Sequence, residues 1–229
     1  MELTECKVCQ NFAEKYSSSA IIHVESKPNI QYKTNQWKPQ KVKFLFVAES
    51  PPHHQTKANI INDSYFYNPI ESQRIFGAQS PLIETLSWNI FWLLGIDNSL
   101  TKEKKLEKFK EMGCFYIDAV KCRIERFNSK IITNRTVKNC SRYLVEEILE
   151  IKPEFIVVMG ERSLFSIKNC LPFNDDDKAK NLNKLINNTQ SKSIVIKNFK
   201  LLFLPLPLWR NLGNLPEILN TFKLIKKEL

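Results

Sequence analysis

The chain has 229 residues, 43% of them hydrophobic and 25% charged, a balance typical of a soluble globular protein. A chain this long can bury roughly 70% of the surface that it exposes when unfolded, so it needs no disulfides to hold a core. No apolar run comes near the roughly 20 residues that span a bilayer, which excludes a membrane protein. The net charge of +10 indicates a polyanionic partner, most commonly nucleic acid; lysines scattered along the chain are the alternative explanation.

The N-terminal residues carry acidic side chains and no apolar core, so they do not resemble a secretion signal. We therefore expect a cytoplasmic protein, in which the six cysteines are thiols or metal ligands rather than disulfides. We also expect a monomer with a single domain over residues 1–229.

Apolar runs rich in β-branched and aromatic residues predict strands that are buried on both faces. In chain order these runs cover residues 42–48, 114–120, 155–159, 193–196 and 201–204. Apolar residues at helical spacing predict helices over residues 80–94, 102–112, from Thr136 or Asn139 to 151, 160–170 and 215–225. Loops are expected over residues 55–75 and 123–134, an extended surface segment over residues 17–40, and a surface insertion over residues 174–192. Because strands and helices alternate, the pattern predicts an α/β fold with a largely parallel sheet and helices on both of its faces.

Polar side chains gather where the 114–120 strand ends. Asp118, Lys121 and Cys122 all lie there, and an α/β sheet presents its ligand site at the carboxyl ends of its strands. Cys140 follows 18 residues later, and Cys6 and Cys9 form a CxxC pair. Four such thiolates hold either zinc or an iron–sulfur cluster. On spacing alone, a metal site and ordinary buried cysteines remain equal alternatives.

The other two cysteines, Cys114 and Cys170, lie within apolar runs and are predicted to be core thiols.

Several segments, in order, resemble motifs of the uracil-DNA glycosylase superfamily, specifically its iron–sulfur branch, usually called family 4. Leu45-Phe-Val-Ala-Glu-Ser-Pro-Pro52 is similar to a strand followed by Gly-Glu-Ala-Pro-Gly. Arg74-Ile-Phe-Gly-Ala-Gln-Ser-Pro-Leu-Ile83 is similar to the Pro-Phe-Val-Gly segment before a Leu-rich helix. Tyr116-Ile-Asp-Ala-Val-Lys-Cys-Arg123 resembles Thr-Asn-Ala-Val-Lys-Cys-Arg, and Pro153-Glu-Phe-Ile-Val-Val-Met-Gly160 resembles the strand that follows.

The resemblance implies a three-layer α/β/α sandwich with a central, mostly parallel sheet. It also implies a [4Fe-4S] cluster, with the N-terminal CxxC segment contributing two of its ligands; the four ligands would be Cys6, Cys9, Cys122 and Cys140.

The chain departs from the family at its second motif, a His-Pro-Ser or His-Pro-Ala loop, where it has Leu206-Pro-Leu-Trp-Arg210. Leu206 replaces a histidine that in relatives stabilises negative charge on the departing uracil. In relatives this loop enters the minor groove, and a wedge side chain fills the space left by the flipped base. Leu208, Trp209 and Arg210 are the candidate wedge and phosphate contacts; a packed Trp and a surface Arg are the alternative.

Asp118 stands where the family has Asn, whose amide can read both O4 and N3–H of uracil. An ionised carboxylate only accepts hydrogen bonds, so it would repel O4 of uracil and would suit the N4 amine of cytosine. A protonated Asp118 would regain a donor, and pairing of Asp118 with Lys121 or a helix N-terminus is a structural alternative.

The first motif also differs, because Ala48 and Pro52 stand where the family has glycines. Glu49 is retained and is the candidate to activate the attacking water or to stabilise the cationic sugar. His53 or His54 is a candidate for contacting a phosphate or assisting the leaving base. Phe76 is the candidate for stacking on the base, which Asp118 and Ala48 would also line.

These residues predict a monofunctional DNA glycosylase that hydrolyses the N-glycosidic bond of a flipped base. A modified cytosine is the expected base, because removal of plain cytosine would destroy the host's own DNA. Hypermodified cytosines occur in phage genomes, so antiviral defence is the expected role. The alternatives are a uracil-DNA glycosylase of base-excision DNA repair and an inactive DNA-binding module.

Overall fold

The structure, a computed structural model, describes residues 21–24, 34–50, 65–69, 85–121, 123–126, 130–171, 194–196 and 198–229.

Within the described residues, the largest sheet has five strands in the order β3-β2-β5-β7-β6. The strands are β2 (Phe44–Ala48), β3 (Cys114–Asp118), β5 (Phe155–Met159), β6 (Ile194–Ile196) and β7 (Phe199–Leu204). The first four in this spatial order pair in parallel, and β6 pairs antiparallel with β7. Every residue of β2, β3 and β5 is buried, which explains why their sequences are nearly continuous apolar runs.

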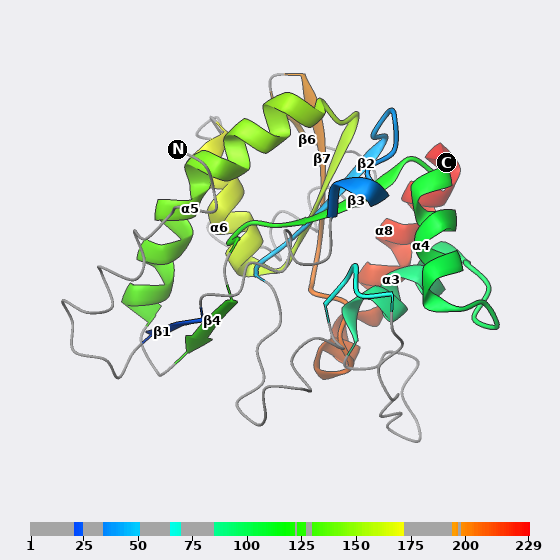
Figure 1. Cartoon of the computed structure of the whole chain (residues 1–229), viewed down its shortest axis with the longest axis horizontal. Coiled ribbons are helices and arrows are strands. Elements are labelled where there is room, and N and C mark those ends of the chain that lie inside the picture. Colours follow the sequence, from blue (N-terminus) through cyan, green and yellow to red (C-terminus); the bar gives the residue numbers. More distant parts are fainter. Residues whose placement is uncertain are drawn as a thin grey trace.

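Helices cover both faces of this sheet (Figure 1). On one side lie α5 (Lys130–Ile151) and α6 (Glu161–Cys170), which pack on each other, and α6 also contacts β2 and β5. On the other side lie α3 (Leu86–Leu94), α4 (Lys102–Glu111) and α8 (Leu215–Glu228), with α4 against β3 and α8 against β7. The predicted three-layer α/β/α sandwich is therefore confirmed.

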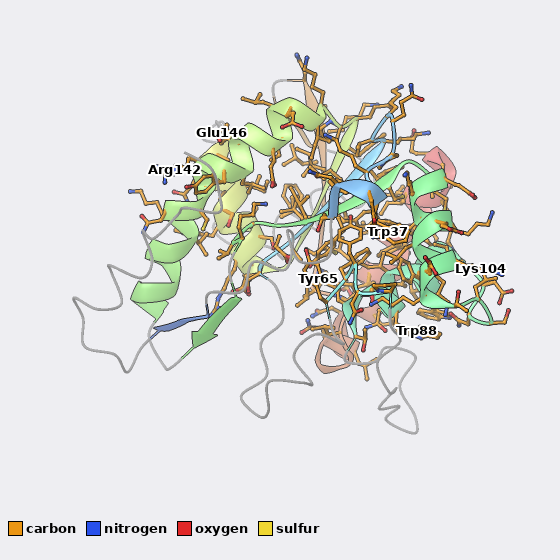
Figure 2. All side chains as sticks on the ribbon, in the orientation of Figure 1. Trp37, Tyr65, Trp88, Lys104, Arg142 and Glu146 are labelled. Carbon is orange, nitrogen blue, oxygen red and sulfur yellow. The ribbon has the colours of Figure 1, made fainter. Side chains whose placement is uncertain are left out.

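Side-chain exposure follows the layers (Figure 2). Lys104 on α4 and Arg142 and Glu146 on α5 are exposed and project away from the sheet. Trp37, in a short 3-10 helix (η2, Thr34–Trp37), and Tyr65 are buried in the interior. No helix in the described part of the chain is both long and apolar enough to cross a membrane.

Most element boundaries follow local signals. Thr101 caps α4, and its side chain accepts a hydrogen bond from the backbone N–H of Lys104. Gly95 ends α3 in the left-handed conformation, with φ of 82°. The strand predicted over residues 155–159 is confirmed without change, and α4 ends one residue before the predicted limit.

Two predictions about the middle of the chain are wrong. Helix α5 begins at Lys130, so Thr136 and Asn139 lie inside the helix and neither caps it. The segment predicted as a loop over residues 123–134 instead contains β4 (Arg123–Arg126). This strand pairs antiparallel with β1 (Ile21–Val24), which lies in the predicted extended surface segment over residues 17–40. Long-range pairing made a strand of Arg-Ile-Glu-Arg, which has little strand character of its own.

The segment over residues 65–69 is irregular, as predicted for residues 55–75, and its first four residues are buried. Tyr65, Phe66 and Tyr67 are each at most 2% exposed. The Tyr67 hydroxyl donates to the backbone carbonyl of Tyr116 at 2.9 Å and accepts from its N–H at 2.7 Å. Within the described residues β3 lies at the edge of the sheet, so this one hydroxyl satisfies two backbone groups that face no neighbouring strand there.

We predict that Tyr67→Phe lowers the free energy of unfolding by about 2 kcal/mol, because a buried carbonyl and a buried N–H lose their partner. Urea denaturation measures this loss. Tyr143→Phe is the matched control: its hydroxyl accepts from the exposed Arg142 on α5, at 2.9 Å, and water can replace that contact. Equal stability of the two variants would contradict this role of Tyr67.

Candidate active site

The carboxyl ends of β2 and β3 bring three predicted site residues to one edge of the sheet. Ala48 is in register with Asp118, and Glu49 follows Ala48 directly. The pairing continues beyond the strands, since Ala119 N–H donates to the Ala48 carbonyl and Val120 N–H to the Glu49 carbonyl, both at 2.8 Å. Ligands of open α/β sheets bind outside this edge. The sequence prediction of a polar site at this strand end therefore agrees with the topology.

Asp118 is fully buried and bound to a neighbour on its own strand. The Tyr116 hydroxyl donates to Oδ1 of Asp118 at 2.7 Å. The Tyr116 ring stacks on Phe66, whose ring also contacts Phe91 of α3 and Phe109 of α4. The Asp118 side chain therefore points toward the α3, α4 and α8 layer.

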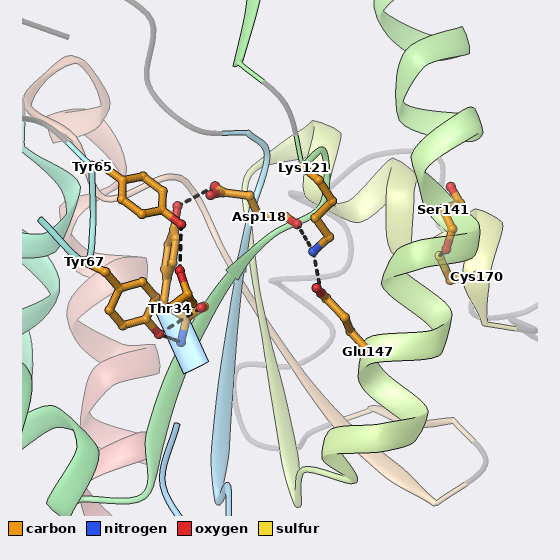
Figure 3. Close-up of polar contacts among 9 residues, drawn as sticks. Thr34, Tyr65, Tyr67, Asp118, Lys121, Ser141, Glu147 and Cys170 are labelled. Carbon is orange, nitrogen blue, oxygen red and sulfur yellow. Dashed lines mark hydrogen bonds and ion pairs between the residues drawn. The ribbon is translucent and has the colours of Figure 1, made fainter. Parts of the chain in front are cut away.

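Lys121 extends in the opposite direction (Figure 3). Its side chain is 1% exposed, and its ammonium donates to the backbone carbonyl of Asp118 and to the carboxylate of Glu147 on α5. The contact between Lys121 and Asp118 that the structure shows thus involves the backbone oxygen. Lys121 ties the end of β3 to α5.

Glu49 has a cationic partner that sequence reasoning missed. Arg162, the second residue of α6, contacts the Glu49 carboxylate at 2.7 Å. The Glu49 side chain is 21% exposed, so water still reaches it. The sequence carries one signal for the ion pair of Glu49 and Arg162. Arg162 closely follows Gly160, where β5 ends, so it is expected at the same edge of the sheet as Glu49.

The loop that contains Leu206 is fixed against this edge. The side-chain amide of Asn89 on α3 donates to the Pro207 carbonyl at 2.7 Å, and that of Asn211 donates to the Leu206 carbonyl at 2.7 Å. Leu206 is half-buried beside Gly160, where an added Cβ would lie 3.5 Å from that of Leu206. Leu208 is only 8% exposed, so its side chain is packed rather than projecting.

The only predicted cluster ligand in the described residues is Cys140. It is 4% exposed on α5 and lies in a small apolar group with Val120 and Val137. Val120 stands two residues before Cys122, and β4, immediately after Cys122, pairs with N-terminal strand β1. The chain just before Cys122 therefore contacts α5, and the chain just after it pairs with β1. Cys140 is thus the one member of the expected four-thiolate set that the structure describes, and no group of three or more metal-ligating side chains occurs within the described residues.

The two other cysteines have the character of core thiols. Cys114 is fully buried, and burial raises its pKa to about 12. Burial raises the pKa of Cys170 to about 11, and its thiol donates to the Ser141 carbonyl at 3.1 Å.

The other predicted site residues lie outside what the structure describes. Nothing is described of Cys6, Cys9, His53, Phe76 and Cys122, and only the backbone is described at Trp209 and Arg210.

An α/β/α sandwich with a mostly parallel sheet belongs to the class of α/β proteins that bind their ligands at the carboxyl edge of the sheet, where this chain has two carboxylates. Residues 35–223 match the family model described as the uracil DNA glycosylase superfamily, and the chain belongs to this superfamily. At the level of the family, this makes it a DNA glycosylase, a hydrolase of base excision. The matched range includes Glu49, Asp118 and the Leu206 loop, and it begins after Cys6 and Cys9. No curated protein matches the chain.

We predict that Glu147→Met lowers the free energy of unfolding by about 2 kcal/mol, because a buried ammonium loses its counter-charge. The double variant Lys121→Met/Glu147→Met is expected to lose less than the sum of the single variants, as measured by urea denaturation. The exposed ion pair of Lys108 and Glu111 is the control. Replacing both of these residues with Met is expected to leave the urea concentration at the unfolding midpoint unchanged. Additive losses at Lys121 and Glu147 would contradict a coupled pair.

Proposed function

We propose that the chain flips a modified cytosine out of DNA and hydrolyses its N-glycosidic bond to leave an abasic site. One observation carries the proposal: Asp118 and Glu49 lie at the same edge of the sheet, in a chain that belongs to a superfamily of DNA glycosylases. The two carboxylates would divide the work: one reads the base and the other acts at the sugar.

Glu49 is the proposed group at the sugar. Its carboxylate accepts a proton from water while the water oxygen attacks C1′; the C1′–N bond breaks, and its electron pair leaves with the base. The same negative charge also stabilises the cationic sugar as that bond lengthens. Arg162 fixes the direction of the carboxylate at 2.7 Å, and partial exposure keeps water within reach. His53 is proposed to supply a proton to the base or to contact a phosphate, in place of the histidine absent at Leu206.

Asp118 is the proposed reader of the base. An ionised carboxylate accepts from the N4 amine of a cytosine and is repelled by O4 of uracil. A site whose buried polar groups match one base rejects a base that leaves them unpaired. Phe76 is proposed to stack on the base, and Ala48, opposite Asp118 in the register, is proposed to line the same pocket. Because Asp118 is fully buried in this structure, the base contacts it only after covering side chains move.

Two further features support the proposal. Lys121 is buried and paired with Glu147, so it is not available as a lyase nucleophile, in agreement with a monofunctional enzyme. The loop over residues 205–208 is held by Asn89 and Asn211, as a loop that enters a DNA groove needs to be. Leu208, Trp209 and Arg210 remain the proposed DNA contacts, and Leu208 would have to leave its packed position to act as the wedge.

We also propose a structural [4Fe-4S] cluster on Cys6, Cys9, Cys122 and Cys140, in a monomer with one domain over residues 1–229. When bound, it would join the N-terminal segment to the end of β3 and to α5. A modified-cytosine substrate makes antiviral defence in the cytoplasm the coherent role, because such bases mark phage DNA rather than the host genome.

The test of the activity is a panel of duplex and single-stranded DNAs that contain cytosine, hydroxymethylated or glucosylated cytosine, or uracil. We expect abasic sites, detected by alkaline strand cleavage, only with modified cytosine. Glu49→Gln is expected to lower the rate at least a hundredfold while DNA affinity changes less than twofold, because it removes the base for water but not the DNA surface.

Each other outcome of this experiment has a definite meaning. Rapid release of uracil with no action on modified cytosine identifies the protein as a repair enzyme and refutes the substrate proposal. DNA binding without any base release, unchanged by Glu49→Gln, identifies an inactive DNA-binding module.

The cluster is tested with two cysteine variants purified without air. We expect iron and sulfide near four each per chain in the wild type and in Cys170→Ala, because Cys170 is a core thiol. Cys140→Ala is expected to lose most of the iron and the visible absorbance. Zinc in place of iron, or equal metal content in the two variants, would contradict the proposed ligand set.

A further inference from the structure

The family resemblance does not account for the hydrogen bond between Tyr116 and Asp118. We infer that Tyr116 is a specificity-determining positioning residue: its hydroxyl keeps Asp118 ionised and oriented, so that the site accepts an amino base and rejects a carbonyl base. This inference rests on the proposed function of Asp118 as the reader of the base.

The first step is geometric. Tyr116 and Asp118 are two residues apart on β3, so their side chains leave the same face of the strand. The hydroxyl donates to Oδ1 at 2.7 Å, the usual length of a strong O–H···O bond. Both residues are buried, Tyr116 at 3% exposure and Asp118 at 0%, so water does not compete for this bond.

The second step is that Tyr116 is held in place on two sides. Its ring stacks on Phe66 with the centroids 4.1 Å apart and the planes 3° from parallel. Its backbone N–H and carbonyl are both bound by the Tyr67 hydroxyl. The buried residues 65–68 therefore hold both the ring and the backbone of Tyr116, and its hydroxyl has a defined position relative to Asp118.

The third step concerns charge. Burial favours the neutral form of a carboxyl group, and donation to its ionised form opposes that effect. Burial, followed by the nearby negative charge of Asp118, raises the pKa of Tyr116 well above its usual value, so its hydroxyl remains protonated and remains a donor. The titratable neighbours Tyr67 and Cys114 also stay neutral, because burial raises their pKa values.

Specificity follows from the ionisation state. An ionised Asp118 has acceptors only, which match the N4 amine of cytosine. A protonated Asp118 has a donor that could bind O4 of uracil, as the family's Asn does. Loss of the Tyr116 hydroxyl should therefore shift the choice of base rather than simply slow the reaction.

The experiment compares Tyr116→Phe, which keeps the ring and its stacking on Phe66, with the control Tyr143→Phe. The measured quantity is the ratio of single-turnover rates on modified-cytosine and uracil DNA. We expect Tyr116→Phe to lower this ratio at least tenfold, and Tyr143→Phe to leave it within twofold. An unchanged ratio in Tyr116→Phe, or an equal change in both variants, overturns the inference.

A double-mutant cycle tests whether Tyr116 acts through Asp118. In the Asp118→Asn background, Tyr116→Phe is expected to change the ratio less than twofold, because no carboxylate remains to be kept ionised. The same tenfold change in both backgrounds would mean that Tyr116 acts independently, and the inference would fall.

Infrared spectroscopy of the proteins without DNA separates this inference from the proposed function. We expect no protonated-carboxyl band assignable to Asp118 in the wild type at neutral pH, by difference from Asp118→Asn, and a new band in Tyr116→Phe. A protonated Asp118 in the wild type overturns the inference even if Tyr116→Phe does not fold. If no base is released from any DNA, the proposed function fails, and the infrared result alone decides the role of Tyr116.

Discussion

The parallel pairing of β2 with β3 is the constraint on which the site depends. It sets Ala48 opposite Asp118, and it continues to Val120 through the Glu49 carbonyl. Because side chains alternate along an extended chain, a single residue of slip would exchange the faces to which Asp118 and its neighbours point. The apolar residues of both strands prevent such a slip, since every one of them is buried against a helix layer or another strand.

The two helix layers hold different parts of the edge. The α5 and α6 layer contacts the charged groups that keep the edge in place: Glu147 binds Lys121, and Arg162 binds Glu49. The opposite layer is largely aromatic around Asp118, where Phe66 and Tyr116 exclude water. The same edge thus offers a partly exposed carboxylate in a charged setting and a buried carboxylate in an apolar one. Two carboxylates with such different surroundings are suited to different chemical tasks.

Sequence reasoning recovered what local pattern determines. The apolar run over residues 155–159 and the capped helix after Thr101 each carry their boundaries in their own residues. It failed where a distant partner decides, as in β4, which is a strand because β1 lies beside it. The same limit applies to the site. Asp118 is a candidate from the sequence because it differs from the family's Asn, whereas the contacts that make Arg162 and Tyr116 candidates exist only in the folded chain.

The two departures at the site, Leu206 and Asp118, are consistent with one kind of leaving base. Uracil leaves as an anion, and a histidine beside it stabilises that charge. A cytosine leaves most readily after it gains a proton, so its departure calls for a nearby negative charge rather than a cation. Under the proposed function, an ionised Asp118 would supply that charge in a buried setting, where it acts most strongly. Leu206, packed beside Gly160, has no proton to donate, so the proposed donor to the base is His53. The loss of the histidine and the change from Asn to Asp would then be two parts of the same chemical adjustment.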